Sequence, residues 1–336
     1  MNGAYSIGVD LGGTNLRIAS YAEGVDFLNS ILMRTRLEEG HNRVVRDLCE
    51  AVSSLADRDY GGRRLIGIGV GTPGPLELPE GILRNPPNLP GWDDFNLRSA
   101  IESTLGRRVT IESDANLAAI AETMCGAGMR HGINSLCTLT LGTGVGSGLV
   151  LDGRIWHGAN GMGGEAGHII VHEHNGAPCG CGGFGCLEQY ASASGVVRMA
   201  REILGEAAPD SSHEVALLAL AGNPGAIQVF KRVGYSLAIG LTSLINTLNL
   251  PLYLIGGGLC EAWDLFAPTM FSELRRMSYV YRLTMPDVLE TARLLPKKTY
   301  ILGAELGTHA GLLGACLLPF QEEPINRPSE NVLVHQ

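Results

Sequence analysis

The sequence predicts an α/β protein with two lobes and a cleft between them. Two segments, 5–21 and 136–153, each have the pattern of a strand, a glycine-rich turn and a second strand. In each half, helix patterns then lead to a buried apolar strand, at 65–70 and at 252–258. Strands alternating with helices are typical of α/β architecture with mixed sheets, and the recurrence suggests an internal duplication.

The remaining elements follow an order that supports this duplication. Helix patterns occupy 42–57, 94–105, 114–128 and 224–249. The third helix begins at Asp114, in or next to the cap position, and ends in glycines. The segment 71–92 is rich in proline and glycine, and a loop of this length inside a compact domain is usually functional.

Composition restricts the class of protein. The chain has 336 residues, of which 45% are hydrophobic, so it can bury a sizeable core in two lobes. A net charge of −9 without a basic stripe argues against nucleic acid as a partner. We expect no signal peptide, and no apolar run is long enough for a membrane span, which predicts a soluble, cytoplasmic protein.

The eight cysteines divide into two groups. Five occur singly inside apolar patterns and are interpreted as small buried hydrophobic residues: Cys49, Cys125, Cys137, Cys260 and Cys316. The other three, Cys179, Cys181 and Cys186, cluster in the glycine-rich stretch "CGCGGFGC". A disulfide framework is not expected in a chain of this length without a secretion signal, so metal binding is favoured over free thiols in a loop.

Three thiolates need a fourth ligand to complete the tetrahedral site that is typical of structural zinc. His168, His172 and His174 lie just upstream, and spacing alone does not choose among them. A site of three cysteines and one histidine has no open position, so the metal is expected to be structural. It would supply free energy to a loop that has large chain entropy and few apolar contacts.

Three glycine-rich turns are candidates for nucleotide binding. They lie in "DLGGTNLR" (10–17), "GTGVGSG" (142–148) and "IGGG" (255–258). The residues expected at the nucleotide are Asp10, Gly12, Gly13, Thr14, Asn15, Thr143, Gly144, Val145, Gly146, Gly256 and Gly257. Free backbone N–H groups in the turns would face phosphate oxygens, and Asp10 would hold Mg²⁺, through water.

The alternative is that each turn is an ordinary hairpin, but two of them take corresponding positions in the repeated halves. A phosphate-binding turn on each side of a cleft suits ATP. "GVGTPG" (69–74) also matches G-x-G-x-x-G, but Pro75 and more loop follow it, so a dinucleotide fold is not expected. The three lysines lie outside the glycine-rich loops, which excludes a Walker-type phosphate loop.

These stretches resemble the ROK family (repressor, open reading frame, kinase) of sugar kinases. The matching motifs run in family order from residue 7 to residue 315: "GVDLGGTNLRIA", "GTPGP", "NLPGW", "ESDAN", "LGTGVGSGLV", "GEAGHI", "CGCGGFGCLEQYAS", "LIGGGL" and "GTHAGLLGA". The resemblance implies a two-lobed fold like that of hexokinase and actin-type ATPases. The Glu-x-Gly-His motif combined with C-x-C-x₄-C is its most specific part.

The resemblance also implies roles for individual residues. Asp114 matches the catalytic base, although an aspartate that only caps a helix is the alternative reading of that position. Contacts to the sugar are implied for Gly74, Asn88, Ser113, Asp114, Glu165, His168 and Glu188. His168 is also implied as the fourth zinc ligand, because the family's histidine follows Glu-x-Gly.

Ser113 departs from the family pattern, in which asparagine usually precedes the catalytic aspartate. Serine has a single oxygen and is shorter, so a sugar hydroxyl would lose a direct contact or reach it through water.

Four further histidines have no visible partners in the sequence and are interpreted as structural: His131, His157, His213 and His309.

The expected organisation is a small lobe, 1–115, completed by a C-terminal helix at 303–318. A large lobe, 116–302, carries the zinc loop, and a tail, 319–336, is expected to be poorly ordered. The family implies a homodimer or homotetramer.

The expected reaction is transfer of phosphate from ATP to the 6-hydroxyl of a hexose, with Mg²⁺ and with glucose as the favoured sugar. A kinase for N-acetylmannosamine or another hexose is the alternative within the class. A sugar sensor without catalysis, or a repressor of the same family, is the alternative of another class. A repressor is disfavoured because the first phosphate turn begins at Ile7, which leaves no room for a preceding DNA-binding domain.

Overall fold

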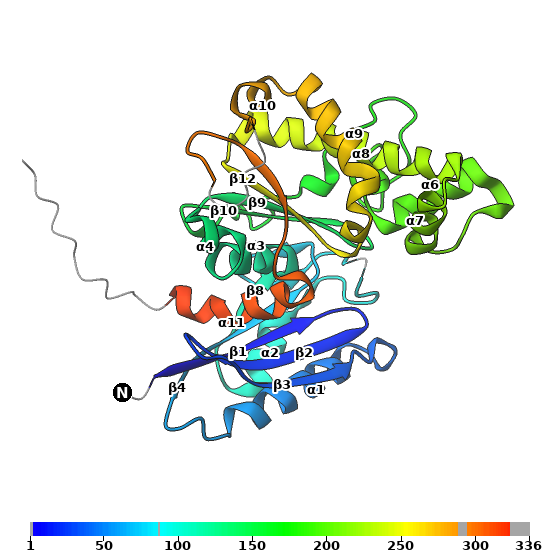
Figure 1. The fold of residues 1–336 in the computed structure, drawn as a ribbon. Coiled ribbons are helices and arrows are strands. Elements are labelled where there is room, and N and C mark those ends of the chain that lie inside the picture. The colour runs from blue at the N-terminus through cyan, green and yellow to red at the C-terminus, as the bar shows by residue number, and fades with distance from the viewer. Residues whose placement is uncertain (1–2, 87, 288–293, 323–336) are drawn as a thin grey trace, which may run out of the picture.

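Two five-stranded sheets of the same topology form the framework of the protein (Figure 1). The structure is a computed structural model that describes residues 3–86, 88–287 and 294–322. The first sheet has the order β3 (Asp26–Arg34), β2 (Asn15–Ala22), β1 (Ala4–Leu11), β4 (Arg64–Thr72) and β8 (Thr110–Ser113). The second has the order β11 (Arg154–Ile155), β10 (Val145–Leu151), β9 (Leu136–Leu141), β12 (Leu252–Gly256) and β13 (Tyr300–Gly303).

The pairing directions also agree between the two sheets. In each, the first three strands are antiparallel and the last three are parallel. The order of elements therefore repeats as the sequence suggested, and the α/β prediction is confirmed. A small third sheet of β5 (Leu76–Glu77), β6 (Ile82–Leu83) and β7 (Phe95–Asn96) lies in the loop region that follows β4.

Two helices, α3 (Asp114–Met124) and α11 (Ala310–Glu322), lie between the sheets (Figure 1). Helix α11 packs on β1 and β4 of the first sheet, helix α3 packs on β9 and β10 of the second, and the two helices pack against each other. Glycines allow the backbones to approach closely. A Cβ atom on Gly69 would lie 2.1 Å from the carbonyl oxygen of Ala315, and one on Gly314 would lie 2.1 Å from that of Leu117.

The outer faces of the sheets carry most of the remaining helices. In the first lobe these are α1 (His41–Ala56) and α2 (Leu97–Leu105), which enclose an apolar core with the sheet. In the second lobe the main core lies under α5 (Glu188–Ala191), α6 (Ala193–Leu204), α7 (Ser212–Leu220), α8 (Pro224–Leu248), α9 (Trp263–Met277) and α10 (Tyr279–Thr284). The predicted buried helix at 224–249 is confirmed as α8, with Asn223 as its N-cap.

The helix predicted at 114–128 is divided in two. Helix α3 ends at Met124, and the short helix α4 (Ala127–His131) follows Gly126. The buried Glu122 carboxylate causes the break, because it accepts the N–H of Ala127 at 3.1 Å with one oxygen. Its other oxygen accepts two N–H groups of the chain segment that leads to α11.

The C-terminal helix also differs from its predicted range. Residues expected at its start form the end of β13 and the short helix η5 (Gly307–His309), and α11 continues to Glu322 rather than 318. Residues 319–322 of the predicted tail are therefore helical, and residues 323–336 lie outside the described residues. Among the helices in the described ranges, none has the length and apolar character needed to cross a membrane.

Candidate active site

The carboxyl ends of the parallel strands in the first sheet place two aspartates close together. In the register, Asp10 of β1 lies opposite Gly71 of β4, and Thr72 of β4 lies opposite Ser113 of β8. Helix α3 begins directly after Ser113, so Asp114 follows the same edge of the sheet as Asp10. Each of these aspartates is a candidate to contact a reacting group.

Ser113, and not Asp114, is the N-cap of helix α3. The Ser113 hydroxyl accepts the N–H of Asn116 at 3.3 Å, and Asp114 is the first helical residue. The reading of Asp114 as an ordinary helix cap is therefore wrong. Asp114 is therefore not the residue that caps helix α3.

The Asp114 carboxylate has a perturbed acidity. Solvent reaches the Asp114 side chain, although many protein atoms lie around its carboxylate. Burial and the negative charge of Asp10 raise its pKa to about 6, and Glu165 contributes in the same direction. The N–H groups of Ala115 and Asp114 oppose this shift, because N–H groups at a helix N-terminus favour a negative charge, but burial outweighs them.

Glu165 is held at this site by the turn that precedes helix η2 (Ala166–His168). The Ser147 hydroxyl donates to the carbonyl of Gly164 and accepts the N–H of Ala166, the latter at 2.9 Å. Burial raises the pKa of Glu165, His168 lowers it, and Glu188 raises it. The structure thus brings Asp10, Asp114, Glu165, His168 and Glu188 into one region.

The first glycine-rich turn joins β1 to β2 and leaves two backbone donors free. The N–H of Gly12 donates to the carbonyl of Asn15 at 2.9 Å, which closes the turn. Among the described residues, no acceptor is found for the N–H groups of Gly13 and Thr14. These two groups have the geometry that the sequence analysis expected of a phosphate-binding turn.

A residue that the sequence analysis missed holds this turn in place. Thr35 follows β3. Its N–H donates to the carbonyl of Thr14 at 2.8 Å, and its hydroxyl donates to the carbonyl of Gly12 at 2.7 Å. Thr35 is 3% exposed. Because the C=O and N–H of a trans peptide point in opposite directions, the hydrogen bond to the Gly12 carbonyl turns the N–H of Gly13 away from Thr35.

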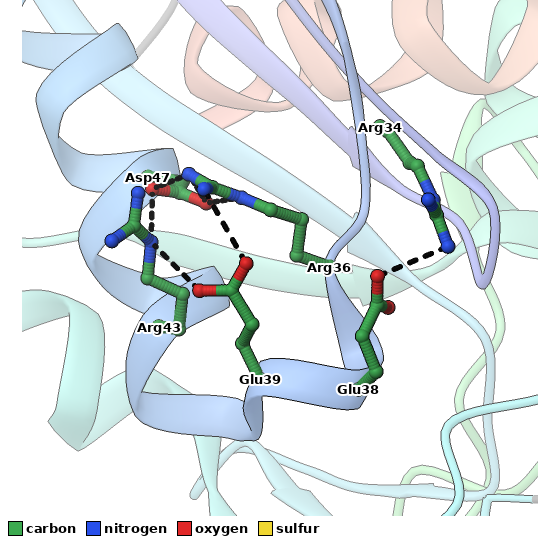
Figure 2. A network of polar contacts seen from close by, with 6 residues as sticks. All are labelled: Arg34, Arg36, Glu38, Glu39, Arg43 and Asp47. Atoms are coloured by element: carbon green, nitrogen blue, oxygen red, sulfur yellow. Dashed lines mark hydrogen bonds and ion pairs between the residues drawn. The ribbon is translucent and has the colours of Figure 1, made fainter.

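An ion-pair network anchors the segment that carries Thr35 (Figure 2). The Asp47 carboxylate is 7% exposed. It accepts two hydrogen bonds of 2.7 Å from the guanidinium of Arg36 and one of 3.0 Å from the guanidinium of Arg43. Glu39 lies 3.5 Å from Arg36 and 3.7 Å from Arg43. The four-residue spacing of Arg43 and Asp47 on α1 was a visible sequence signal, whereas the pairing of Arg36 depends on the fold.

The second glycine-rich turn joins β9 to β10 in the same way. The N–H of Gly142 donates to the carbonyl of Gly144 at 3.0 Å, and in the described structure the N–H groups of Thr143 and Gly144 have no acceptor. The N–H of Val145 donates to the Glu188 carboxylate at 3.0 Å, so this expected phosphate donor is already occupied. A Cβ on Gly144 would lie 2.2 Å from the same carboxylate, which explains glycine at this position.

A shallow, open cavity of about 770 Å³ on the protein surface adjoins the second turn. Its lining residues are Ala193, Ser194, Val197, Arg198, Arg201, Glu202, Asp210, Ser211 and Ser212. The Ser194 hydroxyl donates to the carbonyl of Thr143 at 2.8 Å, which connects the cavity to the turn. The volume is in the range of small-molecule sites.

The third glycine-rich turn ends β12. Gly256 and Gly257 lead into helix η4 (Gly258–Ala262), which contacts β9 and α7. Gly257 has a φ of +90°, and a Cβ there would lie 2.4 Å from the carbonyl oxygen of Leu141 at the end of β9. Close backbone approach to β9 therefore explains this glycine, and it places the turn beside the strand that leads to Thr143.

The loop after β4 reaches the first turn. The carbonyl oxygen of Asn88 lies 2.7 Å from where a Cβ of Gly13 would stand, so the exposed Asn88 is next to this turn. Gly74 is half-buried and follows the end of β4. Both positions border the region that holds Asp10 and Asp114.

The cysteine loop brings four potential metal ligands together. The ligand atoms of His168, Cys179, Cys181 and Cys186 all lie within 4.8 Å of one another. Cys179 Sγ lies 3.7 Å from His168 Nδ1, and Cys181 Sγ lies 3.7 Å from Cys186 Sγ. A zinc tetrahedron with bonds of about 2.3 Å has edges of about 3.8 Å, so these separations fit a closed zinc site.

The other two histidines of this region lie elsewhere. His172 stacks on Tyr190 with ring centroids 4.2 Å apart, and His174 is exposed beside Glu173. His168, in contrast, is the last residue of helix η2. The metal cluster also adjoins Glu188, whose Oε1 lies 3.8 Å from Cys179 Sγ.

The remaining cysteines have no role in this cluster. All eight cysteines are free thiols; Cys49, Cys137 and Cys316 are buried, and Cys125 and Cys260 are half-buried. The interpretation of these five as small apolar residues therefore agrees with their burial, and no disulfide framework is present.

His157, which was interpreted as structural, contacts the strand that precedes Asp114. His157 Nε2 is 2.5 Å from Oε2 of Glu112, the residue two positions before Asp114. The motif "ESDAN" contains Glu112, but the sequence offers no signal for its partner, which is 45 residues away along the chain.

The chain is similar to known sugar kinases over nearly its whole length. The model of the ROK family matches residues 6–322. A glucokinase from Halalkalibacterium halodurans is 33% identical, with 96% of this chain and 97% of that protein covered. An N-acetyl-D-glucosamine kinase from Haemophilus influenzae is 29% identical, with 93% and 98% covered.

Solved structures give the same result. A ROK hexokinase from Thermus thermophilus is 33% identical with a TM-score of 0.78, and 95% of this chain and 98% of that chain are covered. A ROK family glucokinase from Streptomyces griseus, solved in complex with glucose and AMPPNP, is 28% identical with a TM-score of 0.72. That comparison covers 95% of this chain and all of the other.

The cysteine cluster predicts one zinc ion per chain. After a chelator wash, elemental analysis is expected to find about one zinc per chain, because closed sites bind with large free energies. Cys181→Ala should lose the zinc and lower the melting temperature, whereas Cys125→Ala, outside the cluster, should retain the metal. Zinc-free folded protein in which the three thiols of the cluster react with a thiol reagent would contradict the prediction.

The hydrogen bond of Thr35 predicts a selective effect on nucleotide binding. Thr35→Val keeps the side-chain shape but leaves the Gly12 carbonyl without its hydroxyl donor. One hydrogen bond is worth about 0.5–1.5 kcal/mol, so the KM for ATP should rise by about 2- to 10-fold. Steady-state kinetics should show an unchanged KM for sugar, and Thr104→Val, which removes a similar hydroxyl on the exposed side of α2, should change neither constant.

Proposed function

This chain belongs to the ROK family and is an ATP-dependent sugar kinase, and we propose that it phosphorylates glucose at the 6-hydroxyl. The observation that carries the proposal is the arrangement around Asp114. Asp10 and Glu165 act on its carboxylate, whose pKa is raised to about 6, and each of the first two glycine-rich turns has two N–H groups for which the described residues offer no acceptor. Phosphoryl transfer needs such a combination of a proton acceptor and donors for phosphate oxygens.

Asp114 is the proposed catalytic base. The 6-oxygen of the sugar attacks the γ-phosphorus, the bond from that phosphorus to the β–γ bridging oxygen breaks, and the hydroxyl proton passes to the Asp114 carboxylate. A raised pKa favours this role, because a base is most effective when its pKa is near the working pH. The N–H groups at the start of α3 keep the carboxylate ionised at neutral pH despite its two acidic neighbours.

The phosphate groups of ATP are proposed to lie between the two glycine-rich turns. The N–H groups of Gly13 and Thr14 on one side, and of Thr143 and Gly144 on the other, supply four donors. The remaining expected residues, Asn15, Gly146, Gly256 and Gly257, shape these turns, and the cavity beside Ser194 accommodates the nucleoside.

Asp10 is the residue proposed to hold Mg²⁺, through water. Its side chain is 18% exposed and lies 3.7 Å from Arg17 Nε, and burial raises its pKa. An acidic group near two other carboxylates fits a hard divalent cation. The ion would supply charge neutralisation on the phosphates, and Asp10 would orient it.

The sugar is proposed to bind at the acidic residues beside Asp114. Carboxylates accept hydrogen bonds from vicinal hydroxyls, which suits Glu165 and Glu188. His168, Asn88 and Gly74 border the same region, and Ser113 has a hydroxyl proton left to donate because its oxygen accepts the helix N–H. Because Glu188 also accepts the N–H of Val145, one residue would connect the sugar with the phosphate turn.

Zinc is proposed as a structural ion at His168, Cys179, Cys181 and Cys186. The backbone N–H of Gly183 lowers the pKa of the Cys181 thiol, which favours the thiolate that zinc requires. The site is closed, so the ion takes no part in the reaction. Its effect would be to fix the loop between Glu165 and Glu188.

A panel of sugars tests the choice of substrate. ADP release is measured with glucose, mannose, N-acetylglucosamine and N-acetylmannosamine at saturating ATP, and glucose should give the highest kcat/KM. A better reaction with an N-acetylated sugar would move the assignment to an N-acetylhexosamine kinase. Sugar binding without turnover would identify a sensor.

The oligomer, proposed as a homodimer or homotetramer, is measured on the same sample by light scattering.

Replacement of Asp114 is expected to lower the activity and raise the stability of the protein. Asp114→Asn should lower kcat by at least about 10²-fold, the usual scale for a lost general base. It should also raise the melting temperature at pH 7–8, because the pKa of the carboxyl is higher in the folded protein than its unfolded value of about 3.9, so its ionisation costs stability there. Below about pH 4 the group is protonated in both states, and the difference in melting temperature should disappear.

Wild-type kcat/KM for sugar should fall as the pH decreases through about 6, where Asp114 becomes protonated. Asp264→Asn is the matched control, since Asp264 is an exposed aspartate in the first turn of α9. It should leave kcat unchanged and should not raise the melting temperature. An Asp114→Asn variant with near-normal kcat would show that Asp114 is not the base.

A further inference from the structure

A buried carboxylate lies directly before the proposed base. Glu112, the third residue of β8, is 3% exposed. Its Oε1 accepts the N–H of Ser113 at 2.8 Å and the side-chain amide of Asn116 at 2.9 Å. Both donors belong to the junction at which β8 becomes α3. Glu112 therefore fixes the backbone that carries Asp114.

The other oxygen of Glu112 connects this junction to the second half of the chain. Its Oε2 lies 2.5 Å from Nε2 of His157, which follows β11 in the second sheet, and the His157 side chain is 42% exposed. The bond to Glu112 raises the pKa of His157. Loss of this partner would leave a buried charge less well compensated, which is costly in a protein interior.

The segment that begins at His157 leads to Glu165. The carbonyl of His157 accepts the N–H of Gly163 at 2.8 Å, so the intervening residues form a closed loop. Gly161 in this loop packs against the first lobe, where a Cβ would lie 2.8 Å from the backbone nitrogen of Leu78. A displacement of His157 would therefore move the start of the turn that holds Glu165.

From this geometry we propose that His157 is a positioning residue, whose bond to Glu112 sets the separation between Asp114 and Glu165. The inference rests on the proposed function, because it uses the roles given there to these two carboxylates. Glu165 would hold sugar hydroxyls while Asp114 receives the proton, so the distance between them determines whether the reacting hydroxyl faces the base. A misplacement of about 1 Å can cost about 10² in rate.

A pair of amide variants tests the proposal. His157→Gln places an amide N–H at about the position of Nε2 and can still donate to Glu112, whereas His157→Asn has the same chemistry but is too short to reach. The asparagine variant should lower kcat/KM for sugar by about 10- to 100-fold, with the KM for ATP within twofold of wild type. The glutamine variant should stay within about threefold of wild type in both constants.

The control is His213→Asn, a matched change at an exposed histidine that lies 3.9 Å from Glu261. It should change none of the constants. The melting temperatures of all variants are measured first, and if His157→Asn does not fold, His157→Ala takes its place in the comparison. All variants are assayed with the hexose that the wild-type protein phosphorylates fastest. The test of His157 therefore remains valid if that hexose is not glucose.

Three results would overturn the positioning role. In the first, His157→Asn keeps kcat/KM for sugar within twofold of wild type. In the second, the glutamine variant is as impaired as the asparagine variant, which would make the imidazole itself necessary. In the third, the KM for ATP rises by the same factor as the KM for sugar, as a general loss of structure would cause.

Discussion

The close approach of backbones between the two sheets is the constraint on which the rest of the structure depends. Helices α3 and α11 fill the space between the sheets, and glycines allow them to contact the strands and each other without side chains in between. Carbonyl oxygens of Ala315 and Leu117 occupy the places where side chains of Gly69 and Gly314 would stand. Because Asp114 is the first residue of α3, this packing also fixes the proposed base relative to both glycine-rich turns.

The site is built from carboxylates that repel each other and are held in place by neighbouring cationic side chains and backbone N–H groups. Asp10, Asp114 and Glu165 would separate if they were free, since each carries a negative charge in a crowded region. Arg17, His168 and the N–H groups of α3 oppose this repulsion. The cysteine loop and the ion pairs around Asp47 each anchor a segment that reaches the site: Glu188, which contacts the second turn, and Thr35, which contacts the first.

The sequence predicted the fold and the main site residues because both have local signals. Glycine turns after apolar strands, the spacing of the cysteines and the residues around the start of α3 are visible without tertiary structure, and the side chains of His168, Cys179, Cys181 and Cys186 come together in the structure. Contacts between distant segments have no such signal. The pairs Glu112–His157 and Arg36–Asp47, and the hydrogen bonds of Thr35, depend on how the chain folds back. The break between α3 and α4 was missed for the same reason, since Glu122 bonds to residues of the chain near 305.

The position of α11 has a consequence for the order in which the protein folds during synthesis. The Ser6 hydroxyl of β1 donates to the carbonyl of Cys316, 310 residues further along the chain. The inner face of the first sheet therefore stays uncovered until the ribosome has made α11, at about 5–20 residues per second. The second lobe, whose strands lie between residues 136 and 303, can complete its core earlier. The lobe that is translated first thus cannot complete its packing until nearly the whole described chain has been made.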